Sequence, residues 1–129
     1  MSWQSYVDTS LLSSHKIDKA AIFSADGESV WATTPGFNIT PETVKFFAAN
    51  YDSLDSFFSK STNIGEAKYV CIAQEPAGDG AYLRHGKMGV VIIKTKQALI
   101  IAHHPDTVER YDATKVTVAL ATYLTSVGY

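Results

Sequence analysis

Four runs of β-branched and aromatic residues, joined by connections of a few residues, constrain the fold of this chain more than any other feature. The runs cover residues 69–73, 81–84, 88–95 and 98–103. Val, Ile and aromatic side chains favour strands, and connections this short join antiparallel neighbours. The second half of the chain is therefore predicted to form an antiparallel meander, with turns at 76–80, 85–87 and 94–97.

The remaining segments predict helices and one further hairpin. Apolar spacing and capping residues predict helices over 2–12, 40–49 and 52–59, and a last helix capped by Asp112. Strands over 16–24 and 29–33 are predicted to pair, because Asp26-Gly27 between them tolerates the positive φ of a hairpin turn. This order of elements predicts an α+β fold with helices packed on an antiparallel sheet, and it argues against a Rossmann fold.

Length and composition exclude several classes of protein. The chain has 129 residues, 46% of them hydrophobic, which suits a single domain over 1–129. Its one cysteine, Cys71, allows neither an intrachain disulfide nor a cysteine-based zinc site. A net charge of −2 argues against nucleic-acid binding, and no apolar run is long enough to span a membrane. We therefore expect a soluble protein of a reducing compartment, the cytosol.

The residues with chemical potential do not form a recognisable active site. Cys71 lies inside an apolar strand run, where a thiol is normally inert. His103 and His104 are adjacent in a strand, so their side chains are expected to point to opposite faces and cannot hold one metal ion together. Gly89, at the start of a strand, predicts a bulge or a close approach of another group. We expect no enzymatic activity, no catalytic residues, no metal and no cofactor.

Two other features leave alternatives open. Residues 80–105 contain four basic residues and no acid, which indicates either a positive surface or lysines that keep turns and edges soluble. Aromatic residues cluster near both ends of the chain, at Trp3, Tyr6, Tyr123 and Tyr129. They are either ordinary core or, together with Trp31, a shallow groove that suits a polyproline helix.

Several separated segments resemble the profilin family, and most closely the fungal profilins. The first is Ser2-Trp3-Gln4-Ser5-Tyr6-Val7-Asp8, and the others are Val30-Trp31-Ala32, the run from Lys94 to Ala102, and Tyr123-Leu124 through Tyr129. The resemblance implies a central antiparallel sheet, with the N- and C-terminal helices on one face and shorter helices on the other. It also implies binding of monomeric actin, of proline-rich proteins such as formins, and of phosphoinositide headgroups. Faster nucleotide exchange on actin, regulation of actin polymerisation and a cytoplasmic location at the actin cytoskeleton follow from the same resemblance.

The resemblance also implies which residues do the binding. The polyproline site would comprise Trp3, Tyr6, Trp31, Tyr123, Leu124 and Tyr129. The actin face would comprise Lys68, Tyr69, Arg84, Lys87, Val108 and Lys115. Phosphoinositide headgroups are expected on the acid-free stretch, at Arg84, Lys87, Lys94 and Lys96. The bulky, charged segment Glu109-Arg110-Tyr111 departs from the family pattern beside the expected actin face.

Two rival functions remain from other classes of protein. One is a small α+β sensor domain that binds a metabolite in an apolar cavity with convergent polar groups. The other is a hydrolase, which would need Cys71 exposed beside a histidine. Retention on polyproline resin would distinguish the profilin hypothesis from both of these alternatives.

Overall fold

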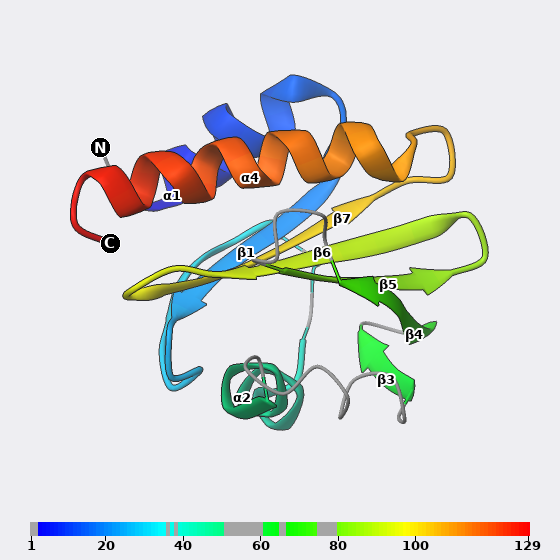
Figure 1. The fold of residues 1–129 in the computed structure, drawn as a ribbon, viewed down its shortest axis with the longest axis horizontal. Coiled ribbons are helices and arrows are strands. Elements are labelled where there is room, and N and C mark those ends of the chain that lie inside the picture. The colour runs from blue at the N-terminus through cyan, green and yellow to red at the C-terminus, as the bar shows by residue number, and fades with distance from the viewer. Residues whose placement is uncertain (1–2, 36, 38, 51–60, 65–66, 75–79) are drawn as a thin grey trace.

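One antiparallel sheet organises the computed structural model, which describes residues 3–35, 37, 39–50, 61–64, 67–74 and 80–129 (Figure 1). Within these residues seven strands lie in the order β2-β1-β7-β6-β5-β4-β3. Their bounds are β1 Lys19–Ser24, β2 Val30–Thr33, β3 Ser61–Ile64, β4 Ala67–Gln74, β5 Gly80–His85, β6 Met88–Lys94 and β7 Ala98–His104. The meander predicted from the sequence is confirmed, because β4 to β7 pair in sequence order. Strand β3 was not predicted, because Ser61-Thr62-Asn63 carries no apolar alternation.

The helices lie in two layers on either side of the sheet (Figure 1). The helical segments are α1 Trp3–Ser5, η1 Tyr6–Leu11, η2 Leu12–Ser14, α2 Pro41–Asn50 and α4 Arg110–Ser126. The N-terminal segments and α4 share one face, and α2 covers the other, as the resemblance implied. The predicted helix over 52–59 and residues 76–79 of the predicted turn lie outside the described residues.

Alternating side chains of the central strands supply a core to each layer. Ile100 of β7 packs with the terminal helices, whereas the next residue, Ile101, packs with α2. This alternation follows from the period of two along a strand. On the terminal-helix side, Val7 and Leu11 are fully buried beside residues of α4. The two terminal helices are therefore fixed to the same face by one continuous apolar core.

Three predicted boundaries need correction. The first helix is wound with π-type geometry over 6–11 and 3₁₀ geometry over 12–14, and it ends at His15 with φ 62°. The strand predicted from residue 16 begins at Lys19. The last helix begins at Arg110 and has Glu109 as its N-cap, without a side-chain cap, so Asp112 lies in its first turn. A negatively charged side chain in the first turn still interacts favourably with the positive end of the helix dipole.

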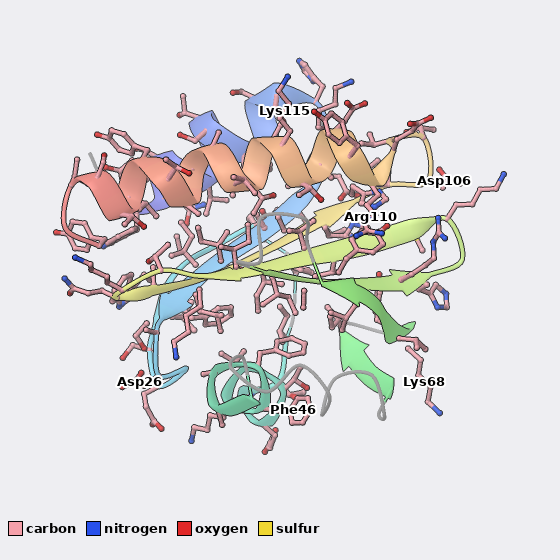
Figure 2. All side chains as sticks on the ribbon, in the orientation of Figure 1. Asp26, Phe46, Lys68, Asp106, Arg110 and Lys115 are labelled. Carbon is pink, nitrogen blue, oxygen red and sulfur yellow. The ribbon has the colours of Figure 1, made fainter. Side chains whose placement is uncertain are left out.

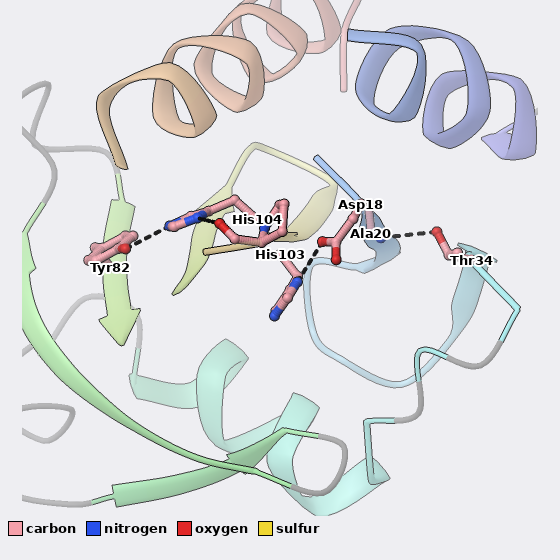
Figure 3. Close-up of polar contacts among 7 residues, drawn as sticks. Asp18, Ala20, Thr34, Tyr82, His103 and His104 are labelled. Atoms are coloured by element: carbon pink, nitrogen blue, oxygen red, sulfur yellow. Dashed lines mark hydrogen bonds and ion pairs between the residues drawn. The ribbon is translucent and has the colours of Figure 1, made fainter. Parts of the chain in front are cut away.

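The adjacent histidines point to opposite faces of the sheet, as the strand period predicts (Figure 3). His103 Nδ1 lies 2.5 Å from the Asp18 carboxylate, and His104 Nε2 lies 2.7 Å from the Tyr82 hydroxyl. His104 Nδ1 is 2.8 Å from the Pro105 carbonyl oxygen, which can only accept, so Nδ1 carries the proton and Nε2 accepts from Tyr82. Both imidazoles are buried. They stabilise the fold through these pairs and are not placed to share a metal ion.

Candidate functional site

Five aromatic rings from distant parts of the chain form one connected cluster. The cluster comprises Trp3, Tyr6, Trp31, Tyr123 and Tyr129. Trp3 lies at its centre, with ring centroids 4.6 Å from Trp31, 5.0 Å from Tyr129 and 5.5 Å from Tyr6. Tyr6 extends the cluster to Tyr123, at 6.0 Å. The structure thus brings together all the aromatic residues expected in the groove.

Polar contacts to the edge of the sheet hold the first helix where these rings meet. The Gln4 side chain donates to the Thr33 carbonyl oxygen at 3.2 Å and accepts from the Thr33 amide at 3.4 Å. Strand β2 is at the edge of the sheet, so no further strand pairs with its outer backbone groups. The Gln4 side-chain amide takes the place of such a strand and satisfies the backbone N–H and C=O of Thr33. The contact fixes α1 over β2, and Trp3 then lies on Trp31. Neither Gln4 nor Thr33 was expected to have this role from the sequence.

The cluster is accessible on one side. Tyr123 is 49% exposed and Tyr129 is 40% exposed, while the other three rings are half-buried. Loss of solvent around the Tyr6 hydroxyl, and then its hydrogen bond with Tyr123, raise the Tyr6 pKa above its ordinary value. A phenol carries its proton at neutral pH even without this shift, so the hydrogen-bonded Tyr6–Tyr123 pair leaves one hydroxyl proton free to donate. The result is an apolar surface edged by hydroxyl donors.

Leu124 does not belong to this surface, so its expected place in the groove is corrected. Its side chain is fully buried in the core under the terminal helices. Leu120, one helical turn earlier, is also buried, and both face the sheet because residues four apart share a helix face. Leu124 supports α4 beneath the rings and cannot touch a ligand on the surface.

Most of the residues expected on the actin face lie toward the end of the sheet away from the two chain ends (Figures 1 and 2). Figure 2 shows Lys68 and Asp106 at that end, with Arg110 turned toward the sheet and Lys115 directed away from α4. The exposed cations there are Lys68, Arg84, Lys87 and Lys115, and Val108 is half-buried. These residues lie on β4, at the β5–β6 hairpin and at the start of α4, and Figure 2 shows Lys68 below the sheet and Lys115 above α4.

Tyr69 is the exception on that face. Its side chain is 3% exposed and packs against His85 and His103, with centroid distances of 5.6 and 6.2 Å. Burial, and then the nearby Asp18 carboxylate, raise the pKa of the Tyr69 hydroxyl. The expected surface contact through this side chain is therefore wrong. Its strand neighbours Lys68 and Val70 are exposed, because alternate residues of β4 face opposite sides.

In the segment Glu109-Arg110-Tyr111, which departs from the family pattern, one side chain points to the interior and another to the surface. The Arg110 guanidinium lies 4.7 Å from the centroid of the buried Tyr82 ring, a cation–π arrangement. The Tyr111 side chain, in contrast, is 71% exposed. Arg110 therefore fixes the start of α4 to the sheet, and Tyr111 alters the surface beside the basic residues.

The four residues expected to bind phosphoinositides fall into two separate pairs. Arg84 and Lys87 lie at the β5–β6 hairpin, whereas Lys94 and Lys96 lie at the opposite end of β6. A seven-residue strand spans about 20 Å, so one headgroup cannot contact both pairs. The second pair lines a hollow of about 570 Å³ with α4 residues that include Thr122, Thr125 and Ser126.

Neither a metal cluster nor a membrane-spanning helix is found among the described residues. They contain no group of three His, Cys, Asp or Glu side chains that could hold a metal ion. None of their helices combines the length and apolar character needed to cross a membrane. The side chain of Cys71 is not among those described, so its expected inertness stays a prediction.

Comparisons with known proteins agree over the whole chain. Residues 1–129 match the family model described as Profilin. The chain is 43% identical to the profilin of Schizosaccharomyces pombe and 38% identical to that of Saccharomyces cerevisiae, each over 100% of both chains. Among solved structures, the S. pombe profilin superposes with a TM-score of 0.92 over 99% of this chain and 100% of that one. Mouse profilin IIa, solved in complex with a double repeat from the FH1 domain of mDia1, has a TM-score of 0.81 over 100% of both chains, at 24% identity.

Proposed function

The chain belongs to the profilin family, and from this membership we propose that its ring cluster binds proline-rich segments. Profilins bind actin monomers, polyproline and phosphoinositides, and they are not enzymes. This chain is accordingly an actin-monomer-binding protein, and the sensor-domain and hydrolase alternatives fall away.

The contact of five rings on an accessible surface carries the polyproline proposal. A polyproline helix is rigid before binding, so little conformational entropy is lost when its flat pyrrolidine rings stack on aromatic faces. Its carbonyl oxygens project outward without internal hydrogen bonds. One hydroxyl of the hydrogen-bonded Tyr6–Tyr123 pair keeps its proton free to donate to such a carbonyl, and the Trp3 indole N–H is a further donor. We expect the FH1 segments of formins to bind in this way.

Titration with a synthetic oligoproline peptide, followed by tryptophan fluorescence, tests this proposal. Trp3→Ala should weaken binding at least about 30-fold, since central aromatic anchors contribute about 2 kcal/mol or more. Tyr111→Ala is the matched control, because it removes an exposed aromatic ring remote from the cluster. Unchanged affinity in Trp3→Ala, with the protein still folded, would refute the assignment.

We propose that actin binds the side of the molecule that carries the exposed cations Lys68, Arg84, Lys87 and Lys115 together with the apolar Val108. Actin is acidic, so this charge would speed the encounter more than it deepens affinity. The surface and the ring cluster lie at opposite ends of the molecule, which allows one copy to hold an actin monomer and a proline-rich protein together. By favouring an open form of actin, binding would speed nucleotide exchange and regulate polymerisation without chemistry in this chain. We place this activity in the cytoplasm, at the actin cytoskeleton, and assign it to residues 1–129 as one domain.

For phosphoinositides, the two basic pairs predict different behaviour. A headgroup on Arg84 and Lys87 would compete with actin, because these residues also belong to the proposed actin surface. A headgroup on Lys94 and Lys96 would not. Vesicle co-sedimentation of Arg84→Ala/Lys87→Ala and of Lys94→Ala/Lys96→Ala, with and without actin monomer, assigns the site to one pair.

A further inference from the structure

Contacts with residues outside α4 help to hold the Tyr129 ring in place. Helix α4 ends at Ser126, and Gly128 has φ +98°, so the backbone leaves helical geometry before Tyr129. Yet the Tyr129 ring meets the Trp3 ring edge-on, at an interplanar angle of 86°. The Tyr129 amide donates to the Leu124 carbonyl at 2.8 Å, which fixes one side of this residue. This bond fixes the amide of Tyr129 but leaves its carbonyl group to be fixed by other residues.

The turn between β6 and β7 supplies that support through three hydrogen bonds. The Thr95 hydroxyl and the Gln97 backbone amide both donate to the Tyr129 carbonyl oxygen, each at 2.6 Å. The Gln97 side-chain amide donates to the Gly128 carbonyl at 2.8 Å. Two consecutive carbonyls beyond the end of α4 are thus bound by residues of one turn.

The turn is itself well anchored. The Thr95 amide donates to the Ala98 carbonyl at 2.8 Å, and the Ala98 amide returns a bond to the Thr95 hydroxyl at 3.1 Å. On its other side, the Ala25 amide donates to the Gln97 carbonyl at 2.9 Å. Because the turn is tied to two buried strands and to the β1–β2 connection, it is a rigid support for the segment 128–129.

We infer that Thr95 and Gln97 are positioning residues for proline-rich ligands, acting through the backbone of Gly128 and Tyr129. They hold the Tyr129 ring against Trp3, so that the accessible surface is formed before the ligand arrives. A ligand that had to order this ring on binding would bind more weakly. This inference rests on the proposed binding of proline-rich segments by the ring cluster.

The test compares variants of the turn by titration with the same oligoproline peptide. Thr95→Val removes the hydroxyl at nearly constant volume, and Gln97→Leu removes the side-chain amide. Together they should weaken binding about tenfold, since both side-chain hydrogen bonds to residues 128–129 are lost and Thr95→Val also removes the acceptor of the Ala98 amide. Thr95→Ser, which keeps the hydroxyl, should bind as the unmodified protein does. Thr122→Ala is the matched control, because Thr122 is exposed on α4 and lines the same hollow as the turn.

A double-mutant cycle separates positioning from general damage. In a Tyr129→Ala background, the Thr95→Val/Gln97→Leu pair should cause no further loss of affinity, because the ring it positions is gone. Equal losses in both backgrounds, or wild-type affinity of the turn variant, would overturn the inference. Should the pair fail to fold, Gln97→Leu alone answers the question, since it leaves the hydrogen bonds of Thr95 intact. Trp3→Ala keeps the two proposals apart: if Trp3→Ala binds normally, the ring-cluster proposal fails, and if only the turn variants bind normally, this inference fails alone.

Discussion

Gly89→Ala should destabilise the protein because the space beside this glycine is already occupied. A Cβ built at Gly89 would overlap the Tyr82 hydroxyl and lie 2.7 Å from His104 Nε2. Tyr82 is fully buried and stacks on His104 at an interplanar angle of 11°. The close approach predicted for Gly89 is therefore confirmed, and the added methyl group must displace a rigid aromatic pair.

The cost can be worked out from these contacts. Breaking the buried Tyr82–His104 hydrogen bond costs about 1–3 kcal/mol, and overpacking costs about as much again. Alanine recovers about 0.5–1 kcal/mol because it has less conformational freedom than glycine in the unfolded chain. We therefore expect a net loss of about 3 kcal/mol in the free energy of unfolding.

Urea unfolding, followed by tryptophan fluorescence, measures this loss. The matched control is Gly86→Asn in the adjacent hairpin, where a Cβ meets nothing within 4 Å and asparagine tolerates the positive φ. In a Tyr82→Leu background the added cost of Gly89→Ala should be smaller, because the overlap with the tyrosine is gone and only the close contact with His104 Nε2 remains. A loss below about 1 kcal/mol, or an equal loss in both backgrounds, would refute the reasoning.

Three further predictions follow from the charges and the buried phenol. Lys87→Glu should slow association with monomeric actin about tenfold at low salt and reduce its salt dependence in stopped-flow measurements; an unchanged rate would exclude steering by this residue. Binding to phosphoinositide vesicles should disappear by about 0.5 M salt, where screening acts within a few ångströms; sedimentation that persists there would indicate an apolar mode. The Tyr69 pKa is raised in the folded state, so the unfolded chain loses this proton at a lower pH than the folded protein does. The free energy of unfolding therefore decreases as the pH rises above about 10. Tyr69→Phe should lose less stability between pH 7 and 11, and equal losses in urea unfolding would contradict this.

The sequence predicted elements that depend on local patterns and missed contacts that depend on the whole fold. The meander followed from β-branched runs, and the opposite directions of His103 and His104 followed from the strand period. The periods of helix and strand could also have shown that two residues assigned to binding surfaces by the resemblance are buried. Leu124 lies one helical turn from buried Leu120, and Tyr69 lies between the exposed Lys68 and Val70.

Other features have no local signal at all. The hydrogen bonds from Gln4 to Thr33, and from Thr95 and Gln97 to the end of the chain, join segments that only the tertiary structure brings together. Nothing in the spacing of these polar residues marks them as different from exposed ones. For Trp31 the residues alone left both core and groove open, because an edge strand can direct a ring to either face, and the resemblance favoured the groove.

The contact between Trp3 and Tyr129 has a consequence for how the protein is made. It joins the first and the last of the described residues, and contacts between residues so far apart tend to form late in folding because closing the loop between them costs entropy. Before Tyr129 has been added to the growing chain, the Trp3 ring can pack on Trp31 and Tyr6 but lacks its edge contact with Tyr129. The surface for proline-rich ligands is therefore complete only when residues 128–129 are in place, and a chain without them leaves one edge of the Trp3 indole uncovered.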